Sequence, residues 1–455
     1  MSDFTIWIAE NRALLATVFS VAALLAMITA GRIHAFPALI VAALLAALGA
    51  GLAPTEALNS IKSGLGGTLG GIAVVIGLGA MFGVLVEASG GVGSLAEWIT
   101  RRAGPKHAPW LMGVVGVIIA IPVFFDVALI ILIPLVVGLA KRAKAAPLAF
   151  GLPLLAGLAT AHAFIPPTPG PIAVAEQLDA DLGWVMLFGV IAGVPAMIVG
   201  GPVFARFAEK RGWLETDEDM AVTWVKEDAR EFNPRLAKLA LTIILLPLAL
   251  IIFGTVLQST STPAALKSLF SFIGAPIVAL LMACGIAALI FNPQNEEEKK
   301  ARRDALARSL EPVGVVLLVT GAGGAFKQVL VDSGAGKALA ESTLALGLVP
   351  VSAGFVLALL IRVAQGSATA AMITAAGLTY PIALAADLSE PKLALVAVAI
   401  AAGATAMSHV NDSGFWLVNR YFGQTTVQTL RTWTVSATLV GVTGFIVAAG
   451  LTALL

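Results

Sequence analysis

Residues that could do chemistry gather at four places where a long apolar run is interrupted. The first interruption centres on Asp126, a carboxylate inside an apolar stretch, and the second follows Arg362, where Gly366 permits a helix break. A charged group in hydrocarbon is costly, so each of these side chains should face a cavity or a partner. Both stretches suit the tip of a re-entrant hairpin. A continuous helix with one buried, paired Asp or Arg is the alternative.

The other two interruptions each contain a histidine. His162 precedes four prolines within Pro166–Pro171, which cannot continue a helix because proline lacks an N–H and clashes with the preceding turn. His409 lies in a polar cluster that runs from Ser408 to Gly414, and the Asn, Asp and Ser residues of this cluster favour caps and turns over helix interiors. Either stretch alone could be a surface loop, but the two histidines align in the repeat described below.

The composition predicts that membrane helices carry these residues. Of the 455 residues, 58% are hydrophobic and 12% are charged, against roughly 25% charged in a soluble globular protein. A soluble domain could not bury so much apolar surface. The net charge of +1 argues against a nucleic-acid partner, and the single cysteine, Cys284, excludes disulfides within the chain. We therefore predict an all-α polytopic membrane protein.

Apolar runs suited to a bilayer recur along the chain, and they predict about 12–14 membrane segments, some too short or too broken for a simple crossing of ~30 Å. The runs lack the period-2 alternation of strands. They lie near residues 13–30, 35–52, 66–88, 108–123, 127–140, 148–165, 183–204, 236–257, 266–292, 311–331, 346–364, 368–388, 392–408 and 431–455.

An internal repeat divides the chain. Gly77–Glu97 aligns without gaps to Gly321–Glu341, 244 residues further on. Two further pairs match at similar offsets: His162 with His409 and Trp184 with Trp433. Short basic loops, placed in the cytoplasm by the positive-inside rule, put the starts of the two copies on opposite sides of the membrane. Inverted-topology repeats of this kind are an architecture of secondary transporters.

The repeat predicts how the chain is divided. Two polar stretches, Arg206–Lys238 and Asn292–Glu311, read as cytoplasmic connectors, and the second contains a charged segment typical of a solvated helix. The expected parts are an N-terminal helix pair at 1–60, a first inverted repeat at 61–205, connectors and linking helices at 206–310, and a second inverted repeat at 311–455.

No motif predicts an enzyme. The chain lacks a His pair at metalloprotease spacing, a Ser or Asp set typical of a membrane protease, and a Walker motif for ATP. We therefore expect no cofactor and no bound metal.

At these interruptions the sequence resembles the gluconate permease (GntP) family of bacterial proton symporters. His409–Trp416, followed by Leu430–Thr434, is similar to that family's C-terminal signature, and Phe124–Asp126 and His162 with its proline run also match. The resemblance extends over nearly the whole chain. Through the wider ion-transporter superfamily it implies two inverted repeats with paired re-entrant hairpins and broken helices, a homodimer, elevator-like movement and a bacterial inner-membrane location.

With a small anionic sugar acid such as gluconate as substrate, the polar residues at the interruptions have suitable roles. Its carboxylate could meet the Arg362 guanidinium, helix N-termini or hydroxyl groups, and its own hydroxyls could pair with amide and hydroxyl side chains. The predicted substrate-binding residues are Arg362, Gln365, Ser367, Thr369, Thr168, His409, Asn411 and Ser413.

Import of an anion against a negative-inside potential needs an accompanying cation, and a proton is the expected one. The candidates to carry it are Asp126, Asp412, His162 and His409. Histidine titrates nearest neutral pH. A carboxylate is nevertheless favoured, because an ionised Asp repels an anionic substrate whereas a protonated one can donate a hydrogen bond to it.

Two other functions stay open from the sequence. A cation/proton antiporter would use Asp126 and Asp412 as cation ligands, although it predicts more carboxylates within the membrane than the chain has. A structural membrane subunit without transport is the other alternative, but such a role does not explain why polar, interrupted stretches recur in both repeats near the middle of the membrane.

Overall fold

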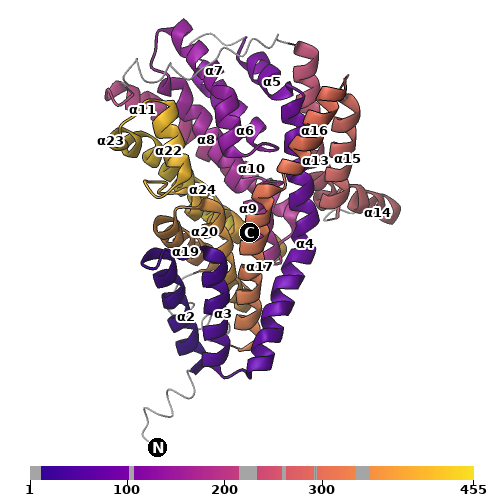
Figure 1. Cartoon of the computed structure of the whole chain (residues 1–455), viewed down its shortest axis with the longest axis vertical. Helices are drawn as coiled ribbons and strands as arrows, with labels where there is room; N and C mark the ends of the chain where they lie inside the picture. Colours follow the sequence, from indigo (N-terminus) through magenta and orange to yellow (C-terminus); the bar gives the residue numbers. More distant parts are fainter. Residues whose placement is uncertain are drawn as a thin grey trace, which may run out of the picture.

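The computed structural model describes residues 12–101, 107–214, 233–258, 263–291, 293, 295–334 and 349–455. Every regular element in these residues is a helix (Figure 1). The first three are α2 (Arg12–Thr29), α3 (Ala35–Ala50) and α4 (Pro54–Ala88).

The predicted first repeat contains two pairs of helices separated by short breaks. Its elements after α4 are α5 (Gly91–Thr100), α6 (Ala108–Ala120), α7 (Phe125–Ala143), α8 (Leu148–Phe164), α9 (Pro169–Gln177) and α10 (Leu182–Ile198), which continues through the π-helical turn η1 (Val199–Val203) into α11 (Phe204–Lys210). The linking helices are α13 (Pro234–Gln258), α14 (Ala264–Ile273), α15 (Pro276–Ile290) and α16 (Glu296–Arg308).

The predicted second repeat shows the same order of long helices and breaks. Its elements are α17 (Glu311–Asp332), α19 (Pro350–Gln365), α20 (Ala368–Ala385), α21 (Glu390–Thr405), α22 (Ser413–Tyr421), α23 (Thr426–Thr429), the π-helical turn η2 (Leu430–Thr434) and α24 (Val435–Leu454).

The described helices confirm a polytopic membrane protein. Seven helical runs are long and apolar enough to span a bilayer, and there are eight if α14 and α15, bent by 60°, form one broken span. The sequence pattern gives one apolar segment at 266–292. The structure divides this segment into α14 and α15. Shorter apolar helices add further segments: Arg12–Ile28, Ala35–Ala50, Ala108–Ala120 and Pro350–Gln365.

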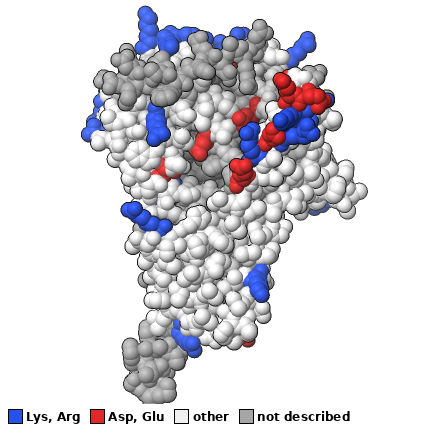
Figure 2. Space-filling model, viewed as in Figure 1, with Lys and Arg blue, Asp and Glu red and all other residues white. Residues whose placement is uncertain are grey.

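The molecular surface is also that of a membrane protein. Large apolar side chains stand exposed on many helices, among them Phe19, Phe272 and Leu289. Figure 2 shows charged side chains gathered toward one end and over α16, whereas much of the remaining surface in this view carries no charge. The charged segment predicted as a solvated helix is α16, which has no buried residue.

Helix α8 lies in the interior. In the apolar window of the α8–α9 run 94% of the residues are buried, against 28% for the run that contains α24. A helix enclosed by other helices needs no polar face, and almost every position of α8 is apolar or small. Its burial brings the break that follows it, at Ile165–Thr168, to the centre of the molecule.

The first helices of the two repeat copies run antiparallel. Gly64 of α4 lies against Gln328 of α17, while Leu69, further along α4, lies against Gly321, earlier in α17. Figure 1 shows the two helices side by side along much of the molecule. Equivalent helices that point in opposite directions are what inverted-topology repeats require.

Some predicted boundaries fall inside helices or outside the described residues. Helix α4 continues through the boundary predicted at residue 60, and α11 continues through the one at 205. The residues at 102–106, in one basic loop, at 215–232, in the first polar stretch, and at 335–348, in the second repeat copy, lie outside the described part.

Candidate functional site

All four predicted interruptions are breaks between helices. In the first repeat they lie at Ile121–Phe124, between α6 and α7, and at Ile165–Thr168, between α8 and α9. In the second repeat they lie at Gly366–Ser367, between α19 and α20, and at Ala406–Asp412, between α21 and α22. The sequence chemistry of each explains its position, because proline, left-handed glycine and Asx caps all end or start helices.

Each broken helix packs against the hairpin tip of the other repeat. A Cβ at Gly170, at the start of α9, would lie 2.7 Å from the Met372 side chain of α20. A Cβ at Gly414, at the start of α22, would lie 3.6 Å from the Phe125 ring of α7. Segments far apart in the sequence therefore meet at two related junctions.

An ion pair joins the hairpin formed by α19 and α20 to the loop between α21 and α22. The Arg362 side chain is 4% exposed and its Nη2 donates to Oδ2 of Asp412. Its Nη1 donates to the carbonyl of Gly366, at the hairpin tip, and its Nε has no partner among the described residues. The guanidinium therefore holds the tip and the loop together.

Asp412 is bound from several sides. Besides Arg362, its Oδ2 accepts from the Ser408 hydroxyl, and its Oδ1 accepts from the Gly414 N–H at 3.1 Å as the N-cap of α22. The Trp433 indole in turn donates to Ser408 Oγ at 2.7 Å. Because both carboxylate oxygens accept hydrogen bonds, this network holds Asp412 in place as a structural partner of Arg362.

Two further side chains of the same loop bind the hairpin arm α19. Asn411 Nδ2 donates to the Val363 carbonyl at 2.8 Å, and His409 Nε2 lies 3.0 Å from the same oxygen. The α21–α22 loop is thus anchored to α19 through side chains at three of its positions.

The first repeat contributes two titratable groups next to this network. Asp126 and His162 both lie within electrostatic range of Asp412. Aromatic contacts accompany these two groups. The Phe125 ring centroid lies 5.6 Å from that of Trp433, and the Phe124 ring centroid lies 6.4 Å from that of His162. We call Asp126, His162, Arg362 and Asp412 the charged cluster.

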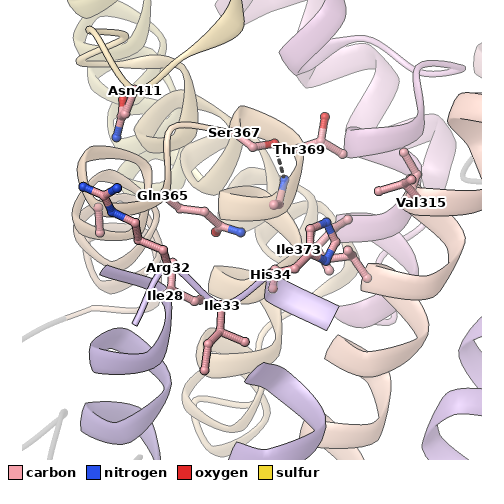
Figure 3. A pocket seen from close by; sticks show the side chains of 15 residues that line it. Ile28, Arg32, Ile33, His34, Val315, Gln365, Ser367, Thr369, Ile373 and Asn411 are labelled. Atoms are coloured by element: carbon pink, nitrogen blue, oxygen red, sulfur yellow. Dashed lines mark hydrogen bonds between the residues drawn. The ribbon is translucent and has the colours of Figure 1, made fainter. Parts of the chain in front are cut away.

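Figure 3 shows a cavity of about 550 Å³ next to the tip between α19 and α20. We call it the hairpin pocket. Its walls are the linker between α2 and α3, one face of α17, the α19–α20 tip and Asn411 from the α21–α22 loop. The polar side chains of the hairpin tip that line it are Gln365, Ser367 and Thr369.

The predicted substrate-binding residues divide into two groups. Gln365, Ser367, Thr369 and Asn411 line the hairpin pocket. The remaining four do not line it: Arg362, Thr168, His409 and Ser413. Thr168 is buried and its hydroxyl donates to the Ile165 carbonyl at 2.9 Å. This hydrogen bond lies within the break between α8 and α9.

Sequence reasoning missed several residues of the site. Arg32 and His34, from the short linker between α2 and α3, line the hairpin pocket. Ser408 and Trp433, which the sequence placed in the polar cluster and in the repeat without a role in the site, belong to the network around Asp412. Two basic side chains in a five-residue linker between apolar helices were the available signal for the first pair. Among the described residues, no group of three or more His, Cys, Asp or Glu is placed to hold a metal ion.

A substitution at Gly366 tests whether the hairpin tip must pack closely against Asn411. Its φ of +84° is strained for any residue with a Cβ, and a Cβ there would also overlap the Asn411 backbone. We expect Gly366→Ala to lower the melting temperature in detergent and to abolish uptake, since the left-handed conformation alone costs about 1–2 kcal/mol. Gly334 is the matched control, because it has φ +69° but no atom of the described residues lies within 4 Å of its Cβ position. Equal melting temperatures for Gly334→Ala and Gly366→Ala would contradict close packing at the tip.

Broken helices from two inverted repeats that pack against each other are typical of secondary membrane transporters. The description "GntP family permease" belongs to the family model that matches residues 12–455. The chain therefore belongs to the GntP permease family, and it is a multi-pass membrane transporter rather than an enzyme.

Similar proteins agree with this assignment over almost their whole length. The low-affinity gluconate transporter of Escherichia coli (strain K12) is 38% identical over 434 residues, which are 95% of this chain and 96% of that protein. The Gnt-II system L-idonate transporter of the same organism is 34% identical over 436 residues, or 94% and 96% of the two chains.

The fold is similar to that of a solved transporter. The crystal structure of the Alcanivorax borkumensis YdaH transporter matches with a TM-score of 0.63 over 88% of each chain, at 17% sequence identity. At this identity the likeness concerns the fold alone.

Proposed function

We propose that this protein imports gluconate or a related sugar acid, together with protons, across a bacterial inner membrane. The observation that carries the proposal is the hairpin pocket, whose hydroxyl and amide side chains include Gln365 and Asn411, on the two segments that hold the Arg362–Asp412 ion pair. The relatives named for gluconate and L-idonate transport support the same class of substrate.

The hairpin pocket suits a polyhydroxylated molecule. Its volume of about 550 Å³ lies within the ~300–1,000 Å³ of small-molecule sites. Gln365 lines the pocket, and an amide side chain can both donate and accept hydrogen bonds. Ser367, Thr369 and Asn411 add groups that can donate and accept.

Asp126 is our candidate for the proton carrier. It is exposed and makes no ion pair or hydrogen bond with another described residue, whereas Asp412 is fully engaged. Entry of an anion against a negative-inside potential is uphill by about 2.3 kcal/mol per charge for each 100 mV, and one co-transported proton cancels this charge. A protonated Asp126 also removes a negative charge from the neighbourhood of an anionic substrate.

The pocket and the charged cluster share two segments of the chain. Gln365 follows Arg362 by one helical turn on α19, and Asn411 directly precedes Asp412. A substrate that contacts Gln365 and Asn411 can therefore change the position of the residues that hold the ion pair. By reciprocity, protonation of the cluster would change substrate affinity by the same factor.

We further propose that the repeats at 61–205 and 311–455 move relative to each other during transport, and that the protein is a homodimer, as its family resemblance implies. Cross-linking in native membranes with mass determination tests the dimer. A single-chain mass under conditions that preserve uptake would contradict it.

Proteoliposome uptake tests the function. We expect labelled gluconate to accumulate when a pH gradient, acidic outside, is imposed, and unlabelled gluconate or L-idonate to compete, because both present one carboxylate and several hydroxyls. A protonophore should abolish the accumulation. A Na⁺-driven pH change without gluconate uptake would identify a cation/proton antiporter, and no transport in either assay would indicate a structural subunit.

A further inference from the structure

Arg32 is a cation of the hairpin pocket that comes from outside the repeats. It lies in the linker between α2 and α3 and lines the pocket. Figure 3 shows its side chain extending from the linker toward Asn411, beside Gln365. Arg32 forms no ion pair or hydrogen bond with another described residue, and none of the 15 lining residues is an Asp or Glu. Its charge is therefore available to a ligand.

Two helix N-termini reinforce the positive potential of the pocket. Helix α3 begins at Ala35, with the His34 imidazole accepting from the Phe36 N–H, and α20 begins at Ala368, with Ser367 as its N-cap. His34, Ala35 and Ser367 all line the pocket. The positive ends of two helix dipoles thus point to the same cavity as the Arg32 side chain, and such ends favour anions.

Arg362, the arginine that the sequence suggested for the carboxylate, is already engaged. It is buried, it pairs with Asp412 and the Gly366 carbonyl, and it does not line the pocket. To bind a substrate carboxylate it would have to leave Asp412 unpaired, and removing one partner from a buried ion pair is strongly unfavourable. Arg32 needs no such exchange.

We propose that Arg32 binds the substrate carboxylate in the hairpin pocket and makes the site selective for sugar acids over neutral polyols. The planar guanidinium fork matches a carboxylate through two parallel hydrogen bonds. The hydroxyl-bearing chain of the substrate then extends toward Gln365, Thr369 and Asn411. This inference rests on the proposed sugar-acid transport, and it makes the N-terminal helix pair a part of the binding site.

Competition between a charged and a neutral ligand tests the inference. Labelled gluconate uptake is measured in proteoliposomes against unlabelled gluconate and against gluconamide, its neutral amide. For the wild-type protein we expect gluconate to compete about 10- to 100-fold better than gluconamide, the range given by hydrogen bonds to a charged group. In Arg32→Gln this ratio should fall close to one, and in Arg32→Lys it should fall to an intermediate value, because the fork is lost and the charge is kept.

Lys62→Gln is the matched control. Lys62 is an exposed cation of α4 that does not line the pocket and pairs with no described residue. Its removal should leave the competition ratio unchanged. The ratio compares two ligands on the same protein sample, so a smaller folded fraction does not alter it.

The outcomes separate the two proposals. An unchanged ratio in Arg32→Lys and Arg32→Gln, with wild-type uptake intact, overturns the role of Arg32 and leaves the proposed function standing. A wild-type protein that accumulates no sugar acid overturns the proposed function and this inference with it.

Discussion

Replacing Arg362 by Lys is expected to reduce sugar-acid uptake at least tenfold and to lower the melting temperature of the purified protein. The guanidinium reaches Asp412 and the Gly366 carbonyl at the same time, and an ammonium group does not reproduce this fork. Complete removal of one partner leaves a buried charge unpaired, which costs about 3–5 kcal/mol. Uptake should suffer even in folded protein, because the pair joins the hairpin tip to the α21–α22 loop.

A set of four proteins separates stability from transport at this ion pair. Arg362→Gln and Asp412→Asn each leave one partner unsatisfied, whereas the double variant removes both charges. We expect the double variant to regain part of the lost melting temperature and none of the uptake. Normal uptake by well-folded Arg362→Lys would show that transport does not need the guanidinium fork, and normal uptake by Arg362→Gln would show that it does not need the ion pair. Additive losses in the double variant would contradict a direct interaction.

The second large effect is expected for Asp126→Asn, which should lose accumulation driven by a pH gradient while keeping substrate exchange. Asn cannot release or take up a proton, but it preserves the size and polarity of the side chain at the start of α7. With equal substrate on both sides no net proton movement is needed, so counterflow should continue. The two assays on one proteoliposome preparation give the comparison.

Asp387→Asn provides the control for this experiment. Asp387 is an exposed carboxylate between α20 and α21 that does not line the hairpin pocket and pairs with no described residue. Its φ of +46° is one that Asn tolerates. Accumulation should be unaffected. If Asp126→Asn and Asp412→Asn both still concentrate substrate along a pH gradient, His162 and His409 become the candidates for the proton carrier.

Much of this protein was determined by local sequence. The composition alone required membrane helices, because no soluble fold could bury so much apolar surface. The four breaks were also predicted, since proline after His162, glycine after Arg362 and the Asx residues after His409 act on their own backbone. The repeat and the family resemblance then gave the transporter class, which the matching family model confirms.

Only the tertiary structure decided which of these residues meet. Arg362 was assigned to the substrate from its type and surroundings, yet the partner it binds, Asp412, lies 50 residues away and is set by the packing of α19 against α21. Arg32 carried no motif and enters the pocket only because the N-terminal helix pair packs beside α17 and α19. A residue's chemistry and local conformation follow from its neighbours in sequence. Its partners follow from helix packing, which depends on side-chain shape along whole helices and leaves no short pattern in the sequence.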